Sequence, residues 1–485
     1  PEVVQQLFIT FRDNAISFDL DSCTNFKDVS FGDKPFGRLE SMKIRCPKAL
    51  TDENFVTLCG LLPRIMNEFE IHVHPISGHV VKELPKTKRL VITQSDITNE
   101  DLQEISKSMG DTLVELDISD CGRITSFANC SFPYLRSCIA EKVPLTNEGL
   151  KALSEACPRL EVLKLDAARG FTTIKGCSFG ALVSLKLGMN LDIKNDDILT
   201  LSAMCGSTLE ELDVGACVSI SHFRGCNFPK LKKLNAANTR IDNEGLKTLS
   251  MAASGLQVLS FYGSRFINSY SGVYFRDLRE LDCTCTTRLS NEELKAISHM
   301  CGNTLEVLDI SHCEGITSFD GTEFRSLSRL VVRSNPHFTE SSVESLSRVC
   351  SSTLQALILS ATGVHSIRDT FVFHHLRKLD ISNQRMQNSD MQMVSKLYGA
   401  SLEALAICGC NDITTFAGCQ LPRLQALYAK GKTTLTDEWL QSLAALCREH
   451  PLEMLDLSGL GGGYVIQNRQ YPFAKVTVWD KAFIF

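Results

Sequence analysis

The sequence lacks a long apolar run, and it lacks an excess of basic residues. No stretch approaches the roughly 18 consecutive apolar residues of a candidate membrane-spanning helix, so we expect no membrane span. The formal net charge is -6, from 50 Lys and Arg against 56 Asp and Glu. Because sequence-independent nucleic-acid binding depends on basic side chains that neutralise phosphates, this balance argues against a nucleic-acid-binding protein.

The sequence also lacks the patterns of a nucleotide site and of a catalytic site. Gly431-Lys-Thr433 resembles the end of a phosphate-binding loop, but Ala426 stands where that motif requires its first glycine. The glycines between Gly459 and Gly463 lack the strand-turn-helix context of a dinucleotide site. No serine, cysteine or histidine arrangement pairs a nucleophile with a base. We therefore expect a protein that is not an enzyme and that has no cofactor and no small-molecule substrate.

Candidate metal ligands are isolated from one another. His72, His74 and His79 are closely spaced, but His74 occupies a turn position that cysteine fills in related segments, and the other two fit a surface loop. The pairs Cys283-x-Cys285 and Cys408-x-Cys410 have no second pair at zinc-finger spacing. The sequence therefore predicts no metal site.

What the sequence does contain is a repeat of about 48 residues, which is visible in the spacing of its leucines. A segment of the type L-x-x-L-x-L recurs in two interleaved series. The first series begins at Leu113, Leu160, Leu209, Leu256, Leu305, Leu354, Leu402 and Leu452, with weaker copies at Ala15 and Met66. The second series begins at Leu39, Thr87, Leu135, Leu182, Leu231, Leu278, Leu327, Leu376 and Leu424. These roughly nineteen repeats predict an α/β leucine-rich-repeat solenoid, a curved horseshoe with a parallel β-sheet on its concave side.

Long and short repeats alternate. From Leu113 onward, each step from the first series to the second is 22 residues, and each return step is 25 to 28 residues. The longer step has room for a helix, and the segments 147–156 and 437–446 combine a capping threonine, acidic residues near the start and apolar residues at helical spacing. The shorter step, such as 124–133, has no room for a helix. We therefore expect helix-containing long repeats to alternate with helix-less short repeats.

The twenty cysteines recur in register with the repeat. One group follows the predicted strands: Cys23, Cys121, Cys217, Cys313 and Cys410. A second group ends the predicted helices: Cys59, Cys157, Cys205, Cys301, Cys350 and Cys447. A third position is shared by Cys130, Cys177, Cys226 and Cys419. Such placement is typical of small buried side chains with a weak donor, so we expect reduced structural thiols, for which the interior of a cell is the natural setting.

Segments such as 145–165 resemble the cysteine-containing class of leucine-rich repeats, which is common in F-box substrate receptors of ubiquitin ligases and in other intracellular adaptors. The resemblance covers nearly the whole chain and implies the fold more specifically than the function. The short repeats depart from this class, since their Ile-Thr-Ser-Phe and Gly-Cys-x-Phe-Pro pieces resemble expanded repeat arrays of protists. Repeats begin near residue 15, which leaves no space for an F-box within the chain.

The repeats predict one elongated domain, from 1 to 463, and a different C-terminal segment. After Gly463 the leucine pattern stops, and residues 464–485 alternate apolar and polar side chains. Because the last repeat of a solenoid exposes its core, we expect residues 464–485 to form a cap or tail. The chain begins at Pro1 rather than at methionine, which leaves room for native residues upstream, including any targeting signal.

The candidate site is the concave face of the sheet, where alternate strand residues point away from the core. In the central repeats these residues are mostly polar, such as Glu115, Asp117 and Asp213. Further along the chain they become first basic and then apolar. An exposed apolar patch of this kind often marks a contact, so we expect a protein partner to bind at Arg329, Arg333, Ile358, Ala404, Ala406, Ala426, Tyr428 and Met454. Cover by the C-terminal tail, and the absence of any binding role, remain open alternatives.

Together these features predict a non-enzymatic protein-interaction scaffold. Two subtypes are compatible with them. One subtype is a structural subunit of a larger intracellular assembly of cytoskeletal or ciliary type, in the cytoplasm or associated with the cytoskeleton. The alternative is a substrate-recognition subunit of an SCF-type ubiquitin ligase, with any F-box lying upstream of Pro1. An extracellular receptor is disfavoured by the cysteine pattern.

Overall fold

The structure is a computed structural model. It describes residues 2–21, 31–32, 34–45, 51–72, 78–286, 288–431, 436–448 and 450–458. The predicted cap or tail at 464–485 lies outside these ranges.

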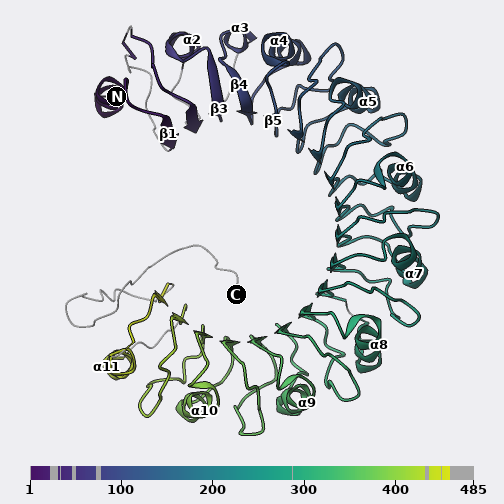
Figure 1. Cartoon of the computed structure of the whole chain (residues 1–485). Helices are drawn as coiled ribbons and strands as arrows, with labels where there is room; N and C mark the ends of the chain where they lie inside the picture. Colours follow the sequence, from purple (N-terminus) through teal and green to yellow (C-terminus); the bar gives the residue numbers. More distant parts are fainter. Residues whose placement is uncertain are drawn as a thin grey trace. The chain divides into compact units, whose positions relative to one another are not determined.

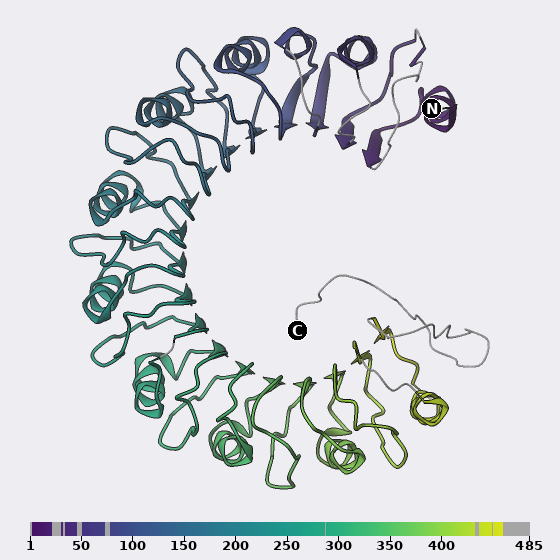
Figure 2. The ribbon, with the colours of Figure 1, turned by 180° about the vertical axis from the view of Figure 1, so that it is seen from behind.

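The chain divides into two compact units. The first unit contains residues 1–240 and 251–253, and the second contains residues 241–250 and 254–485. Each unit is built from the same kind of repeat and is described by itself. Within each unit, the strands lie on the concave side and the helices lie on the convex side (Figures 1 and 2).

The first unit contains a parallel sheet in which each strand pairs with the next strand along the chain. The register aligns the core positions of successive repeats, for example Leu90 with Leu116 and Leu163 with Leu185. Its strands are β1 (Ser17–Asp21), β2 (Ser41–Arg45), β3 (Ile65–Ile71), β4 (Lys86–Ile92), β5 (Glu115–Asp117), β6 (Ser137–Ile139), β7 (Val162–Lys164), β8 (Ser184–Lys186), β9 (Glu211–Asp213) and β10 (Lys233–Asn235).

The second unit repeats this arrangement, and its strands also pair in parallel in sequence order. Its strands are β11 (Val258–Ser260), β12 (Glu280–Asp282), β13 (Val307–Asp309), β14 (Arg329–Val331), β15 (Ala356–Ile358), β16 (Lys378–Asp380), β17 (Ala404–Ala406), β18 (Ala426–Tyr428) and β19 (Met454–Asp456). Parallel strands joined through the convex side, one per repeat, establish the predicted leucine-rich-repeat solenoid.

The helices confirm the predicted alternation of repeats. They are α1 (Glu2–Phe11), α2 (Asp52–Leu61), α3 (Gly78–Val81), α4 (Asn99–Met109), α5 (Asn147–Ala156), α6 (Asn195–Cys205), α7 (Asn243–Ala252), α8 (Asn291–Cys301), α9 (Glu340–Cys350), α10 (Asn388–Tyr398) and α11 (Asp437–Leu446). From Leu113 onward every short repeat is fully described and has no helix, and α5 and α11 have the predicted bounds. The exception is α3, a single four-residue turn in the short step between β3 and β4.

Local sequence explains where the helices begin. Thr98 caps α4: its hydroxyl accepts the backbone N–H of Asp101, and the Asp101 carboxylate accepts the backbone N–H of Thr98 in return. Thr146 and Thr436 cap α5 and α11 in the same position, by accepting the backbone N–H groups of Gly149 and Trp439.

The core lies between the strands and the convex segments. Leu113, Leu116 and Ile118 are at most 1% exposed. The short loop of the same repeat adds Phe127, which packs against Phe132 with ring centroids 6.3 Å apart. Burial of one such side chain contributes roughly 1.5–3 kcal/mol, so the stacked repeats share a continuous apolar core.

Candidate interaction surface

The predicted binding residues of the second unit lie in two parallel rows on the open face of its sheet, which is the face that points away from the core. Strand register sets one row as Arg329, Ala356, Lys378, Ala404, Ala426 and Met454. The other row is Val331, Ile358, Asp380, Ala406, Tyr428 and Asp456. The structure therefore brings seven predicted residues together, and Arg333 follows the end of β14. Lys378, Asp380 and Asp456 belong to the same rows, and our sequence analysis did not identify them.

The apolar part of this surface is less exposed than the sequence suggested. Ile358 is 1% exposed, and with Val331 and Ala356 it forms a buried cluster. Ala404 and Ala406 are also buried, at 9% and 2%. Strand residues on this face point away from the core, as expected, but their neighbours on the face cover them. We expected Ile358 to be an exposed contact residue, but the structure shows that it is buried.

An ion pair spans the strand that carries Ile358. The guanidinium of Arg333 lies 3.8 Å from the carboxylate of Asp380. Arg333 follows β14, Asp380 belongs to β16, and β15 lies between these strands and carries Ile358. The arginine side chain must therefore extend across β15 to reach its partner. The Arg333 side chain is 46% exposed, so its charged end stays near solvent.

The accessible part of the surface includes the larger side chains. Ala426, Tyr428, Met454 and Arg329 are partly exposed, and Arg333 is exposed. Burial and the nearby Asp456 carboxylate raise the pKa of Tyr428, so its hydroxyl is neutral at physiological pH. The arrangement is a floor of buried small and aliphatic side chains, with an aromatic ring, a thioether and two guanidinium groups that a partner can reach.

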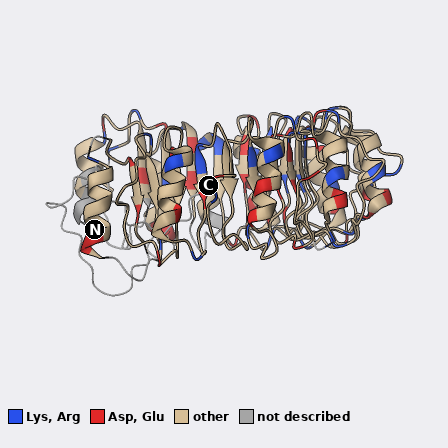
Figure 3. Ribbon diagram, turned by 90° about the horizontal axis from the view of Figure 1, so that it is seen from below, with Lys and Arg blue, Asp and Glu red and all other residues tan. Residues whose placement is uncertain are grey.

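The polar residues of the central repeats, all in the first unit, hydrogen bond within the sheet. Asp117 accepts the backbone N–H of Ser119 at 3.0 Å, and Asp213 accepts the side-chain amide of Asn235 at 3.0 Å. Glu115 pairs with Arg89 across neighbouring strands, at 3.1 Å. These contacts satisfy the carboxylates locally, although the groups stay partly open to solvent. Figure 3 shows acidic and basic residues interspersed over the described helices and strands.

A charged cluster on β2–β4 was not identified from the sequence. Glu70, which is 5% exposed, contacts Arg45 at 3.0 Å, Lys43 at 3.5 Å and Arg89 at 3.6 Å. His72 contacts the same carboxylate at 2.7 Å. Burial alone would raise the pKa of Glu70, but the hydrogen bonds from His72 and Arg45 outweigh it and lower that pKa to about 2. Glu70 therefore remains charged and holds several cationic side chains together.

The cysteines act as buried hydrogen-bond donors. All eighteen cysteines that the structure describes are free thiols. The thiol after the strand donates to a backbone carbonyl of an earlier repeat, as in Cys121 to Ile92 (3.2 Å) and Cys217 to Leu187 (3.1 Å). Burial raises the pKa of Cys121 to about 11 and that of Cys217 to about 12, so neither is a thiolate at neutral pH. Cys23 lies outside the described residues.

Neither metal-binding nor membrane-spanning features occur in the described part of the chain. No group of three or more His, Cys, Asp or Glu side chains there could hold a metal ion. His74, like the side chain of His79, lies outside what the structure describes. None of the described helices has the length and apolar character needed to cross a membrane.

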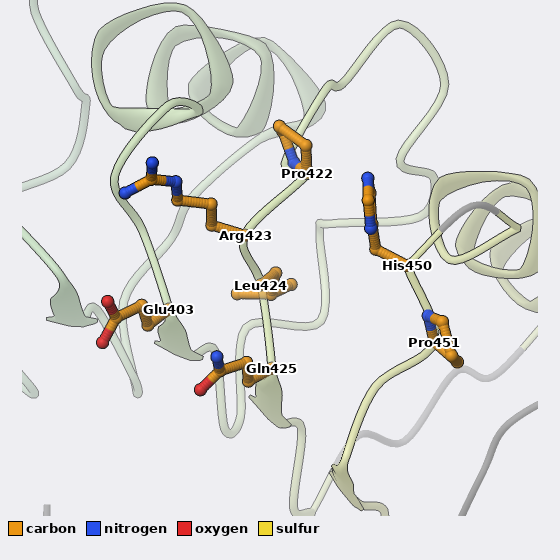
Figure 4. A pocket seen from close by; sticks show the side chains of 7 residues that line it. All are labelled: Glu403, Pro422, Arg423, Leu424, Gln425, His450 and Pro451. Atoms are coloured by element: carbon orange, nitrogen blue, oxygen red, sulfur yellow. The ribbon is translucent and has the colours of Figure 1, made fainter.

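A shallow polar hollow of about 450 Å³ lies where β17–β19 begin (Figure 4). Its lining includes Glu403, Arg423, Gln425 and His450. Glu403 precedes β17 and forms an ion pair with Arg377 at 3.6 Å. The hollow combines no nucleophile with a base, and we assign it no chemistry.

No family model matches the sequence, and no curated protein matches it either. Among solved structures, the chain is similar to the crystal structure of the TLR13–ssRNA13 complex, with 16% identity and a TM-score of 0.42. That similarity covers 95% of this chain and 66% of the other. The chain is also similar to the crystal structure of the Rad7 and Elc1 complex in yeast, with 16% identity and a TM-score of 0.38, over 78% of this chain and 84% of the other. Similarities at this level do not support any conclusion about function. The assignment of the solenoid fold is based on the strand pairing of this chain.

Proposed function

We propose that the protein is a non-enzymatic interaction scaffold that binds a protein partner on the open, concave face of its second unit. The observation that carries this proposal is the pair of rows on β14–β19, where Tyr428 and Met454 are accessible beside a floor of small side chains. Aromatic and arginine side chains are enriched among the residues that supply most of the binding energy at interfaces. Small neighbours allow a partner backbone to approach them closely.

The proposed contact has two parts. Tyr428 and Met454 supply apolar anchors, and Ala404, Ala406 and Ala426 form a floor beside them. Arg329 and Arg333 supply the charged rim, which fits acidic groups on the partner. Ile358, which is 1% exposed and clusters with Val331 and Ala356, belongs to the floor.

Two cellular roles are compatible with such a scaffold. We propose first a structural subunit of a larger intracellular assembly, of cytoskeletal or ciliary type, because the resemblance to cysteine-containing repeats implies an intracellular adaptor. The free, buried thiols favour the same reducing environment. The alternative is the substrate-recognition subunit of an SCF-type ubiquitin ligase, with an F-box upstream of Pro1. In both roles the ligand is a protein, not a nucleic acid or a small molecule.

The proposal includes one continuous solenoid from 1 to 463, with residues 464–485 as its terminal cap or tail. This rests on the continuous leucine spacing and on the loss of that spacing after Gly463.

Affinity purification with quantitative mass spectrometry tests the binding face. The double variant Tyr428→Glu/Met454→Glu should weaken capture of the principal partner by about tenfold or more, as expected for loss of interface anchors. The double variant Glu115→Lys/Asp213→Lys, on the open face of the first unit, is the matched control and should leave capture unchanged. If the control variant abolishes capture and the first variant does not, the binding surface lies on the polar repeats and the proposal is wrong.

A further inference from the structure

A second surface of the first unit lies at the edge where the strands end. After each of the strands β4 to β10 the chain turns through a residue with positive φ. In neighbouring repeats the residue with positive φ is Gln94, Asp120, Lys142, Ala167, Met189, Ala216 and Asn238. The row is therefore polar at both ends and apolar at the three consecutive positions Ala167, Met189 and Ala216.

The apolar side chains of this row are exposed. Met189 is 57% exposed, Leu191 is 58% exposed and Val218 is 39% exposed. A long side chain in the left-handed conformation is costly, whereas asparagine and glycine are tolerated there. Met189, with φ 63°, is as long as Gln94 and Lys142 in the same row but is apolar and 57% exposed, so it serves neither the backbone nor solubility. Its presence calls for another explanation.

Met189 and Leu191 line a cavity of about 530 Å³. Its walls include Ala167, Phe171, Met189, Leu191 and Ala216. Phe171 is 2% exposed, so the cavity has an aromatic side chain fixed in its wall. A cavity of this volume and apolar lining is large enough for one bulky side chain of a ligand.

The charges beside the cavity indicate what kind of ligand it fits. Arg169 and Asp192 line the cavity and are exposed. In the preceding repeats the charges of this edge are paired, Arg123 with Asp96 at 3.7 Å and Lys142 with Asp120 at 3.2 Å. Arg169 and Asp192 have no ion-pair partner among the described residues. One free cation and one free anion beside an apolar cavity complement a ligand that carries both signs of charge.

We propose that this cavity binds a linear peptide segment of a partner protein. The segment presents a bulky aliphatic or aromatic side chain to the cavity, an acidic residue to Arg169 and a basic residue to Asp192. An anionic membrane would instead require a cluster of basic residues. A stable dimer would require roughly 800 Å² of surface on each partner. The cavity lies at the ends of three neighbouring strands, which together span only about 10 Å across the sheet, so it is too small for such an interface.

Selection from a displayed library of random dodecapeptides tests the proposal, with the full chain as the target. Enriched peptides should share an apolar residue flanked by an acidic and a basic residue. A synthetic peptide of the enriched sequence, followed by fluorescence anisotropy, should bind Leu191→Glu at least about tenfold more weakly than the unchanged protein. Leu199→Glu is the matched control, because Leu199 is a 44% exposed leucine on α6 of the same repeat and does not line the cavity.

Charge reversal provides the sharper test. The double variant Arg169→Glu/Asp192→Lys should lose affinity for the selected peptide and regain it for a peptide whose acidic and basic residues are exchanged. Circular dichroism melting curves should confirm that all variants fold, since each changed residue is exposed. Absence of any enriched peptide would overturn the proposal. So would equal losses in Leu191→Glu and Leu199→Glu, binding of phosphatidylserine vesicles without peptide binding, or self-association that Leu191→Glu abolishes.

Discussion

The side-chain oxygen of Asn147 accepts the backbone N–H of Thr172 at 2.8 Å, which joins the start of α5 to the short loop of the next repeat. The same oxygen accepts the backbone N–H of Thr173 at 3.3 Å. The first residue of other helices makes the same contact with the following loop: Asn99, Asn195, Asn243, Asn291 and Asn388, with Glu340 in the equivalent place on α9. These side chains satisfy loop N–H groups that no strand or helix could satisfy.

Replacement of Asn147 should therefore destabilise the solenoid. Asn147→Ala removes the acceptor of two loop N–H groups that are exposed or half-buried, which should cost about 0.5–1.5 kcal/mol. Urea unfolding followed by circular dichroism measures the loss. Glu148→Ala, on the exposed neighbouring residue, is the control and should change stability by less than about 0.5 kcal/mol. An Asn147→Ala protein with the unfolding midpoint of the unchanged protein would show that solvent replaces these contacts at no cost.

Replacement of Met189 by asparagine should raise the stability of the protein. Met189→Asn relieves a long side chain held at positive φ and should raise stability by about 0.5–1 kcal/mol. The converse change, Asn238→Met at the equivalent position of a later repeat, should lower stability by a similar amount. Both are measured by urea unfolding. If Met189→Asn is stabilising and also weakens peptide binding, then methionine is present at this position for binding rather than for folding.

Glu70 should make stability depend on pH in the acid range. Its folded-state pKa of about 2 lies below the ordinary value of 4.5, so folding favours the charged form. The resulting stabilisation is present above pH 4.5 and is lost as the pH falls toward 2. Glu70→Gln should cost about 2–3 kcal/mol at pH 7, and the difference from the unchanged protein should shrink across this window.

The control for Glu70 is Glu115→Gln, which removes an exposed carboxylate that also contacts Arg89. Exposed ion pairs contribute at most about 1 kcal/mol, so this variant should differ little at any pH. Equal effects of the two variants, in urea unfolding at pH 7 and pH 3, would contradict the role assigned to the buried cluster.

The cysteines should behave as protected free thiols. Because burial raises the pKa of Cys121 to about 11 and of Cys205 to about 12, native protein should react slowly with alkylating reagents at pH 7.5. After denaturation, all twenty cysteines should be alkylated, as measured by intact mass. Reductant and chelator should both leave the melting temperature unchanged. Protected disulfides or a stoichiometric metal would contradict the proposed intracellular environment.

Periodicity predicted the fold because the same leucine pattern occurs in one repeat after another, so each repeat supports the interpretation of the others. The threonine caps and apolar spacing were sufficient to place α5 and α11 at their observed bounds. The same method was weaker near the N-terminus, where Met66 and Thr87 begin imperfect copies. There α3 was not expected, and the ion pairs around Glu70 depend on side chains that come together only across strands.

The candidate site was predicted less completely than the fold. Strand alternation gives the direction of a side chain, and the two rows on β14–β19 follow from it. Alternation does not give how far neighbouring side chains cover that side chain, and Ile358 is buried in a cluster with Val331 and Ala356. The edge cavity had a signal that our sequence analysis did not use: Met189 and Leu191 interrupt a row of polar turn residues.

The contact between Arg333 and Asp380 gives the final prediction. Asp380 is 5% exposed, so Arg333→Ala leaves a buried carboxylate without this cation. We expect a loss of about 1–3 kcal/mol in urea unfolding, because an uncompensated buried charge is costly. The double variant Arg333→Ala/Asp380→Asn should recover part of that loss, since the neutral amide needs no cation. A double variant whose loss equals the sum of the two single losses would show that the arginine and the aspartate act independently.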